Sequence, residues 1–220
     1  GSAGVDSLDF SAISTAKAVT INGGLGGTAG NAGDTLKGGA GNDTITFSGL
    51  GNATLVGNGG NDTITGSTGN DTITGGTGAD TLTGGGGNDV FVYGVVADSA
   101  PATYDTITDF VAKTSTANGD TIKLILNTFP AAGAAGAAAA AATLTVSVAN
   151  SGSLALAALS SGAYGADKIN AALDASTGTL YIDLAGGTVS AGHAVSDGTA
   201  DLAIVLTGVT TITSSAFVLA

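Results

Sequence analysis

Residues 57–92 read GNGGNDTIT, GSTGNDTIT, GGTGADTLT and GGGGNDVFV in direct succession. A fifth copy, GGAGNDTIT, occupies residues 38–46, and two weaker copies, AGNAGDTLK and SGLGNATLV, occupy residues 29–37 and 48–56. The last of these follows a one-residue insertion at Phe47. A tandem period of nine residues predicts a repeat architecture in which stacked neighbours bury a continuous core.

Each nonapeptide combines a turn with a short strand. Positions 7 to 9 are Thr-Ile-Thr or close variants, so the middle side chain is expected to point inward and its Thr neighbours outward. Positions 1 to 6 are turn residues, in which Gly adopts backbone angles closed to other residues and leaves carbonyl groups outside any ladder. Ca²⁺ takes about six to eight oxygen ligands, so these carbonyls and the Asp carboxylate suit it, whereas Mg²⁺ retains its waters.

The pattern Gly-Gly-x-Gly-x-Asp-x-apolar-x resembles the calcium-binding nonapeptide of the repeats-in-toxin (RTX) family. The resemblance implies an all-β fold, namely a right-handed parallel β-roll with a β-rich C-terminal cap. Two nonapeptides would form one coil, so residues about 18 apart would stack and the Asp residues would form two columns. The first column would contain Asp43, Asp62, Asp80 and Asp98. The second would contain Asp34, Ala53, Asp71 and Asp89, with Ala53 standing where the family has Asp.

Calcium is expected to lie between stacked Asp residues. Coils about 4.8 Å apart bring carboxylates together, which repel one another until a divalent ion lies between them. Sound sites are expected at the steps 43–62, 62–80, 80–98 and 71–89, and weakened ones at Ala53. Ordering the chain costs more free energy than the inward side chains return, so the segment is predicted to be disordered without Ca²⁺ and folded with about four or more ions.

The expected metal ligands are the column carboxylates, the turn residues and three Asp residues at the end of the roll. They are Asp34, Gly38, Gly39, Ala40, Gly41, Asp43, Gly57, Asn58, Gly59, Gly60, Asp62, Gly66, Ser67, Thr68, Gly69, Asp71, Gly75, Gly76, Thr77, Gly78, Asp80, Gly84, Gly85, Gly86, Gly87, Asp89, Asp98, Asp105 and Asp109.

Four segments are predicted along the chain. They are N-terminal strands that cap the roll (1–28), the RTX roll (29–101), roll-terminating strands (102–124) and a β-rich C-terminal domain (125–220). Residues 104–110 and 119–124 resemble the end of serralysin-type rolls, in which Asp98, Asp105 and Asp109 would complete terminal calcium sites. A solvated strand edge is the equally open alternative for Asp105 and Asp109.

Short strands separated by Gly, Ser and Asp turns are expected in the flanking segments. They cover residues 5–11, 18–22, 143–148, 168–170, 179–184, 202–206, 209–213 and 216–219. The Ala-rich run 131–142 fits a short helix or a flexible loop.

The chain end resembles the uncleaved C-terminal signal of type I secretion substrates. The resemblance rests on residues 178–183, 206–210 and 217–219. Ala216 stands where the family commonly has Asp, and Ala220 adds one residue after the motif.

Composition excludes several functions. The 17 acidic and 5 basic residues give a net charge of −12, which argues against nucleic-acid binding. There is no Cys for a disulfide or thiolate site, and no apolar run long enough for membrane insertion. The sequence lacks Glu, and its single His193 has no Gly-x-Ser-x-Gly motif around nearby Ser190, so no zinc-protease or Ser-hydrolase site is expected. The lack of Met predicts a fragment or a processed chain.

The leading functional prediction is an extracellular calcium-binding module without enzymatic activity. It would belong to a bacterial surface-layer protein or adhesin exported by type I secretion machinery, and could self-associate in a surface lattice. One alternative is the C-terminal secretion and folding domain of a secreted hydrolase, such as a serralysin-like protease or lipase. Another is ice binding by outward Thr residues such as Thr63, Thr72 and Thr81.

Overall fold

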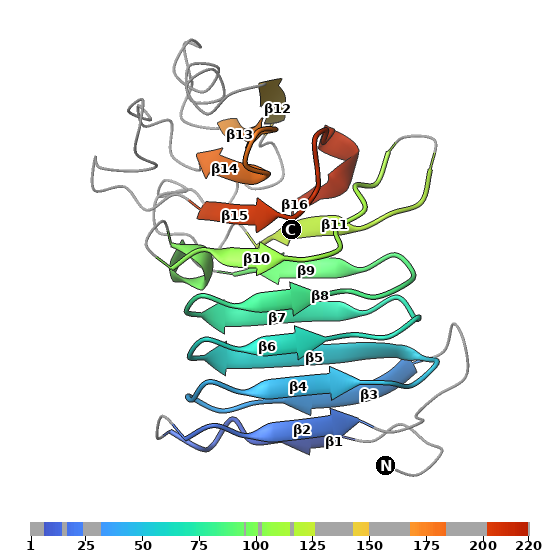
Figure 1. The fold of residues 1–220 in the computed structure, drawn as a ribbon, viewed down its shortest axis with the longest axis vertical. Helices are drawn as coiled ribbons and strands as arrows, with labels where there is room; N and C mark the ends of the chain where they lie inside the picture. The colour runs from blue at the N-terminus through green and yellow to red at the C-terminus, as the bar shows by residue number, and fades with distance from the viewer. Residues whose placement is uncertain are drawn as a thin grey trace.

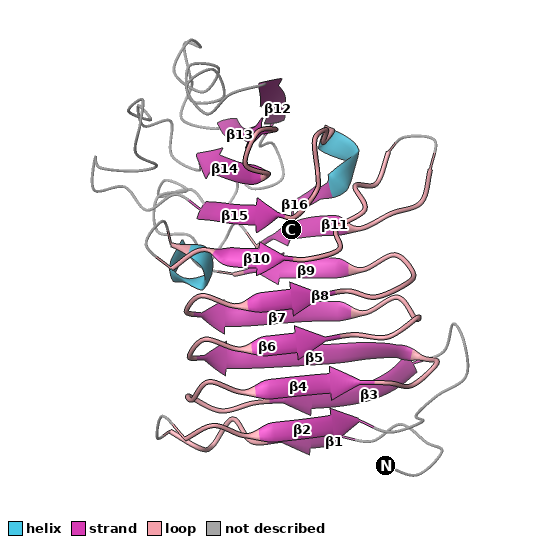
Figure 2. Cartoon of the chain, in the orientation of Figure 1, coloured by secondary structure: helices cyan, strands magenta, loops and turns pink. Residues whose placement is uncertain are grey.

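The chain forms two mainly parallel β-sheets stacked as the two sides of a roll (Figure 1). The computed structural model describes residues 7–14, 17–23, 32–94, 96–100, 103–114, 117–125, 143–149, 168–183 and 202–219. Figure 2 shows that strands dominate this part of the chain, with short helical turns near the C-terminal end of the roll. The expected all-β parallel roll is confirmed.

Odd and even strands alternate between the sheets. In spatial order, the first sheet contains β1 (Ser7–Asp9), β3 (Ala32–Lys37), β5 (Asn52–Gly59), β7 (Thr72–Thr77), β9 (Val90–Tyr93), β11 (Thr121–Leu124) and β16 (Phe217–Leu219). The second contains β2 (Thr20–Gly23), β4 (Thr44–Phe47), β6 (Thr63–Thr65), β8 (Thr81–Thr83), β10 (Asp105–Ile107), β15 (Leu202–Leu206), β14 (Thr179–Asp183), β13 (Lys168–Asp174) and β12 (Thr143–Ala149). Two 3-10 helices, η1 (Val96–Ser99) and η4 (Ser214–Ala216), precede β10 and β16.

The register shows that two nonapeptides make one coil. Leu55 on β5 pairs with Ile73 on β7, which lies 18 residues further along the chain. Ile45 on β4 pairs with Ile64 on β6, 19 residues on, because Phe47 adds one residue to that coil. The insertion is therefore accommodated within one coil without shifting the strands that follow.

The core is a narrow layer of apolar side chains between the sheets. Each strand of the repeat region contributes at least one inward apolar residue that is at most 2 % exposed, and β4, β5 and β9 add Phe47, Ala53 and Tyr93. One row contains Leu36, Leu55, Ile73, Phe91 and Ile122, and the opposite row contains Ile21, Ile45, Ile64, Leu82 and Ile107. Because alternate residues of a strand face opposite sides, the Thr residues beside them face outward.

The outward Thr residues form rows on each sheet rather than one row around the roll. On the second sheet Thr44, Thr63, Thr81 and Thr106 stand in register, and Thr46, Thr65, Thr83 and Thr108 form a parallel row. Thr72 lies on the first sheet, where it pairs with Thr54 and Val90. Thr72 therefore does not share a surface with Thr63 and Thr81.

The C-terminal segment completes both sheets of the roll. β16 pairs in parallel with β11, and β15 pairs in parallel with β10, so strands far apart in sequence lie side by side (Figure 1). β15, β14 and β13 are antiparallel neighbours, and β12 is parallel to β13. The chain thus covers the last repeat coil with its own C-terminal strands.

Most expected flanking strands are present, with one error. The prediction for 209–213 was wrong, because this stretch is irregular and precedes η4. Val209 and Ile212 are buried there, so their apolar character reflects packing rather than a strand. The Ala-rich run 131–142 and His193 lie outside the described residues.

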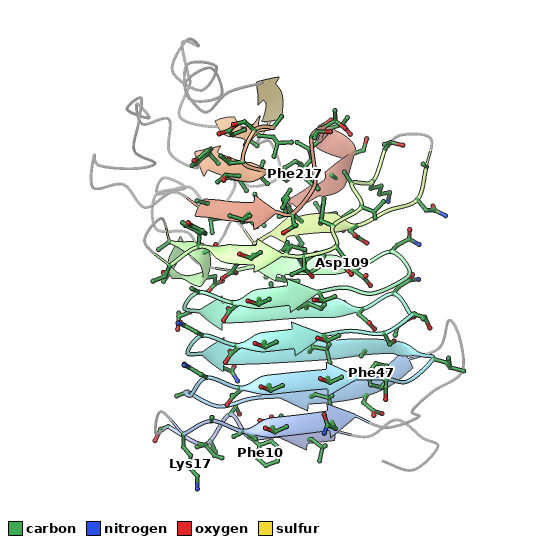
Figure 3. All side chains as sticks on the ribbon, in the orientation of Figure 1. Phe10, Lys17, Phe47, Asp109 and Phe217 are labelled. Atoms are coloured by element: carbon green, nitrogen blue, oxygen red, sulfur yellow. The ribbon has the colours of Figure 1, made fainter. Side chains whose placement is uncertain are left out.

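The N-terminal end of the roll is closed by a further coil without Asp in its turn. Phe10 N donates to Lys37 O at 3.0 Å, and Ala40 N donates to Ile13 O at 3.0 Å, so this turn follows the one above it. Figure 3 shows Lys17 at this end, with its side chain directed away from the body of the roll. No helix in the described part of the chain is long and apolar enough to cross a membrane.

Candidate metal centre in two aspartate columns

The first column links consecutive coils through amide–carboxylate hydrogen bonds. The Asp43 amide donates to Asp62 Oδ1 at 2.7 Å, and the Asp62 amide donates to Asp80 Oδ1 at 2.8 Å. The Asp80 amide donates to Asp105 Oδ1 at 2.9 Å. At the other end, Asp43 Oδ1 accepts from Val19 N at 2.7 Å. One oxygen of each carboxylate is therefore committed to the preceding coil.

The second column repeats this arrangement on the opposite edge. Ala53 N donates to Asp71 Oδ1 at 2.6 Å, Asp71 N to Asp89 Oδ1 at 2.8 Å and Asp89 N to Asp120 Oδ1 at 2.9 Å. Asp34 precedes Thr35, whose partner Thr54 follows Ala53, and a register irregularity lies between Ala32 and Thr35. The methyl group of Ala53 leaves this step without the carboxylate that the other steps contain.

The expected place of Asp98 in the first column was wrong, because Asp105 fills it. Asp98 lies on η1, where its Oδ2 accepts from Gly94 N at 2.7 Å. It keeps the local turn contact that Asp43 Oδ2 makes with Gly39 N at 2.6 Å, but it does not accept an amide from the preceding coil at Asp80. A column Asp such as Asp62 lies at the start of a strand, and the second residue after it points inward. Asp105-Thr106-Ile107 meets this condition, whereas Asp98 is followed by Ser99 and Ala100.

Asp120 completes the second column, and the nine-residue period of the repeat did not predict it. The signal that could have found it is the tripeptide Asp-Thr-Ile, which recurs at residue 120 after a longer loop. Asp109 lies beside this end of the column, where its two carboxylate oxygens accept from Gly84 N at 2.9 Å and Gly85 N at 2.8 Å. The terminal Asp residues are thus anchored to backbone amides rather than left along a solvated edge.

Glycine at the first position of the repeat makes room for the second carboxylate oxygen. A Cβ atom placed on Gly57 would collide with Asp62 Oδ2 and with the carbonyl oxygen of Gly75 in the next coil. Gly66 has the same surroundings, supplied by Asp71 Oδ2 and the carbonyl oxygen of Gly84. A carboxylate oxygen and a carbonyl oxygen therefore approach the same small space in successive coils.

Carbonyl groups also stack along the turns. Gly76, with φ of 104°, faces the carbonyl oxygen of Asn58, and Gly78, with φ of 133°, faces that of Gly60. These positive φ angles are accessible to Gly at little cost. Asn58 itself has φ of 80° and donates from its side-chain amide to Gly38 O at 2.8 Å. The turns consequently present rows of backbone oxygens beside the Asp columns.

The column carboxylates are buried in a way that opposes their charge. Burial raises the pKa of Asp62 and of Asp89 to about 7, that of Asp80 to about 6 and that of Asp105 to about 8. Repulsion between neighbouring carboxylates adds to these increases in pKa. The Oδ2 atoms of Asp62, Asp80 and Asp105 are buried and lack a hydrogen-bond partner. A buried, unpaired carboxylate oxygen requires either a proton or a cation.

The donor set fits a hard cation better than a transition metal. Within the described ranges, no three His, Cys, Asp or Glu side chains form one metal-binding group. A bound ion would therefore draw several of its ligands from the backbone carbonyls of the turns. Ligation by carbonyl and carboxylate oxygens is typical of Ca²⁺.

Comparison with known families assigns this repeat. The family model for the RTX calcium-binding nonapeptide repeat matches in four copies, at residues 28–46, 47–82, 56–91 and 65–99. The chain carries RTX calcium-binding repeats. Together the matches cover residues 28–99, roughly a third of the chain. They include the N-terminal coils of both columns. No curated protein matches the chain.

The RTX repeats imply Ca²⁺, and the residues of both columns fit that ion. The oxygens that would hold it include the Oδ2 atoms of column residues such as Asp62 and Asp80 and the turn carbonyls next to them. Bound Ca²⁺ supplies positive charge where the roll buries carboxylates. RTX repeats are typical of secreted extracellular bacterial proteins.

Gly57→Ala should weaken calcium-dependent folding. The new methyl group would overlap Asp62 Oδ2 and the Gly75 carbonyl oxygen, at a cost of about 1–3 kcal/mol or roughly 5- to 150-fold in the calcium midpoint. Gly86→Ala is the matched control, because its nearest contact would be an ordinary 3.7 Å from Thr68. The measurement is far-UV circular dichroism during calcium titration, and equal midpoints for the two variants would refute the proposed packing.

Without calcium, order should increase as the pH falls. The folded roll holds the pKa of Asp62, Asp80, Asp89 and Asp105 above that of Asp in an unfolded chain, so folding takes up protons. This contribution to stability is complete below about pH 4 and is lost as the pH rises through about 6 to 8. In excess chelator, the β-sheet signal should therefore be larger at pH 5 than at pH 8.

The doubly substituted Asp62→Asn, Asp89→Asn chain provides the control for this pH effect. Asn has nearly the same shape as Asp and does not titrate in this range, so the pH dependence should become shallower. A β-sheet signal that stays constant or falls between pH 8 and pH 5 in the parent chain would contradict the assignment.

Proposed function

We propose that this protein is an extracellular module that folds when it binds calcium after type I secretion, within a bacterial surface-layer protein or adhesin. The observation that carries the proposal is the pair of buried Asp columns, in which the Oδ2 atoms of Asp62 and Asp80 have no partner. In water-poor surroundings these carboxylates oppose folding until a cation compensates them. Calcium would therefore act as part of the folded structure.

Calcium concentration would decide where folding occurs. Extracellular calcium modules bind with dissociation constants of about 10⁻⁴ to 10⁻³ M, far above the free calcium level of a cytosol. A chain with these sites would remain unfolded before export and fold in a calcium-rich exterior. Such a delay suits a secretion route that transports unfolded chains.

The C-terminal strand supports export before folding. Phe217 and Ala216 are buried, and β16 pairs with β11 at the end of the first sheet. A secretion signal that includes residues 217–219 would be unpaired only while the roll is unfolded, because in the folded roll β16 pairs with β11 and Phe217 is buried, whereas Val218 is 41 % exposed. Calcium-dependent folding would then pair this segment into the first sheet and bury Phe217 once the signal is no longer needed.

A structural role at the cell surface is part of the same proposal. The chain is rich in Gly, Ala, Thr and Ser, lacks Cys and Met, and has 10 % charged residues. This composition suits a self-assembling surface protein. The absence of Glu and the presence of a single His in the sequence argue against a catalytic role.

The test is a calcium titration of the chelated protein followed by far-UV circular dichroism. The proposal predicts a disordered spectrum in chelator and a cooperative gain of β-structure at about 10⁻⁴ to 10⁻³ M Ca²⁺, with little gain at the same concentration of Mg²⁺. A spectrum unchanged by millimolar Ca²⁺ would exclude calcium-triggered folding.

Light scattering on the same samples tests the surface-lattice role. Calcium-driven growth into ordered assemblies is expected for a lattice protein, and electron microscopy of the assemblies should show a regular spacing. A compact monomer at all calcium concentrations would favour a passive secretion module, such as the C-terminal domain of a secreted hydrolase, over the lattice role.

A further inference from the structure

Tyr93 occupies a place that belongs to glycine in the preceding coils. The β7–β9 register pairs Ile73 with Phe91, so Tyr93 stacks on Gly75, which in turn stacks on Gly57. A Cβ atom on Gly57 or Gly75 would collide with the Oδ2 atom of the Asp five residues later. The first column therefore changes its chemistry at Tyr93, because a large side chain replaces the hydrogen atom of glycine.

This side chain displaces the local carboxylate from the column. Asp98 is the Asp five residues after Tyr93, and it lies on η1 outside the amide–carboxylate series. Its place in the series is taken by Asp105, which arrives after a longer connection. The Tyr side chain thus explains in steric terms why the nine-residue count fails at this coil.

The Tyr93 hydroxyl faces the end of the first column inside the roll. The residue is 1 % exposed, and its hydroxyl group is buried without a hydrogen-bond partner. Asp105 Oδ2 is likewise buried and lacks such a partner. Burial, followed by the negative charge of Asp105, raises the pKa of the Tyr93 phenol, with smaller contributions from Asp80 and Asp98, so the phenol keeps its proton. A neutral donor and a buried acceptor therefore share one enclosed space.

A second hydroxyl closes the column on its other side. The Asp105 amide donates to Ser99 Oγ at 2.8 Å, in the position where the other column amides meet the carboxylate of the next coil. Ser99 Oγ donates in turn to Ala203 O at 2.6 Å, on β15 of the C-terminal segment. No further carboxylate follows Asp105 in this series of described residues, and a neutral side chain takes its place.

We propose that the Tyr93 hydroxyl, rather than a calcium ion, is the partner of the Asp105 carboxylate, and that Tyr93 and Ser99 together terminate calcium binding in the first column. This inference rests on the proposed calcium-dependent fold. The phenol donates its proton in a hydrogen bond to Asp105 Oδ2. Its ring fills the space that Gly57 and Gly75 leave open in the preceding coils. The last coil consequently has a neutral, calcium-independent cap where the preceding coils have a metal site.

The experiment counts the calcium ions bound per folded chain in three proteins. Equilibrium dialysis followed by elemental analysis gives the number for the parent chain, for Tyr93→Gly and for Tyr93→Phe. Tyr93→Gly restores the glycine of the repeat and should bind one more ion than the parent. Tyr93→Phe should bind the same number as the parent, with a melting temperature in calcium lowered by roughly 2–8 °C through loss of one buried hydrogen bond.

Tyr104→Phe is the matched control, because Tyr104 is 47 % exposed and should change neither quantity. Loss of one ion in Tyr93→Phe would show that the hydroxyl is a calcium ligand and would overturn the inference. An unchanged ion count together with an unchanged melting temperature in Tyr93→Phe would overturn it as well, as would a folded Tyr93→Gly with the parent's ion count. If Tyr93→Gly does not fold, the Tyr93→Phe result decides alone. A parent chain that binds no calcium would refute the proposed function instead, which keeps the two failures distinct.

Discussion

The interaction on which the structure depends is the hydrogen bond from a backbone amide to the buried carboxylate of the next coil. Asp43, Asp62 and Asp80 each donate their amide to the carboxylate of the following column Asp, and each accepts through Oδ1 from an amide of the preceding coil. The other oxygen is left in a space that only glycine keeps open. The same bond that sets the spacing of the coils also buries negative charge.

This constraint couples the core to the turns. The column Asp comes two residues before the inward apolar side chain, as Asp62 does before Ile64, so one register places both. A shift of one residue would turn Ile64 outward and remove the carboxylate from its column at the same time. The apolar layer between the sheets is thin, and the columns beside it require a cation. Stability and metal binding are consequently properties of the same contacts.

The sequence predicted the periodic part of the molecule well because the spacing of residues within each repeat determines their positions in the coil. The nine-residue period, the inward apolar residues and six of the column Asp residues follow from local spacing, and each recurs where the structure has it. Prediction failed where the period ends. Tyr93 carries a side chain at a glycine position, so Asp98 leaves the column and Asp105 replaces it. Asp120 follows Asp89 in the second column although it lies 31 residues later in the sequence. The length of the loop, and not the repeat, determines this separation. The pairing of β16 with β11 likewise depends on contacts between distant segments, and no local pattern specifies it.

The central claim is that calcium compensates the buried Asp columns and thereby holds the coils together. Amide hydrogen–deuterium exchange measured near neutral pH with calcium and with excess chelator tests it most directly. The amides of Asp43, Asp62, Asp71 and Asp80 donate to column carboxylates, so they should exchange slowly in calcium and rapidly once calcium is removed. Equal protection of these amides in calcium and in chelator would show that the columns are stable without the ion and would contradict the account.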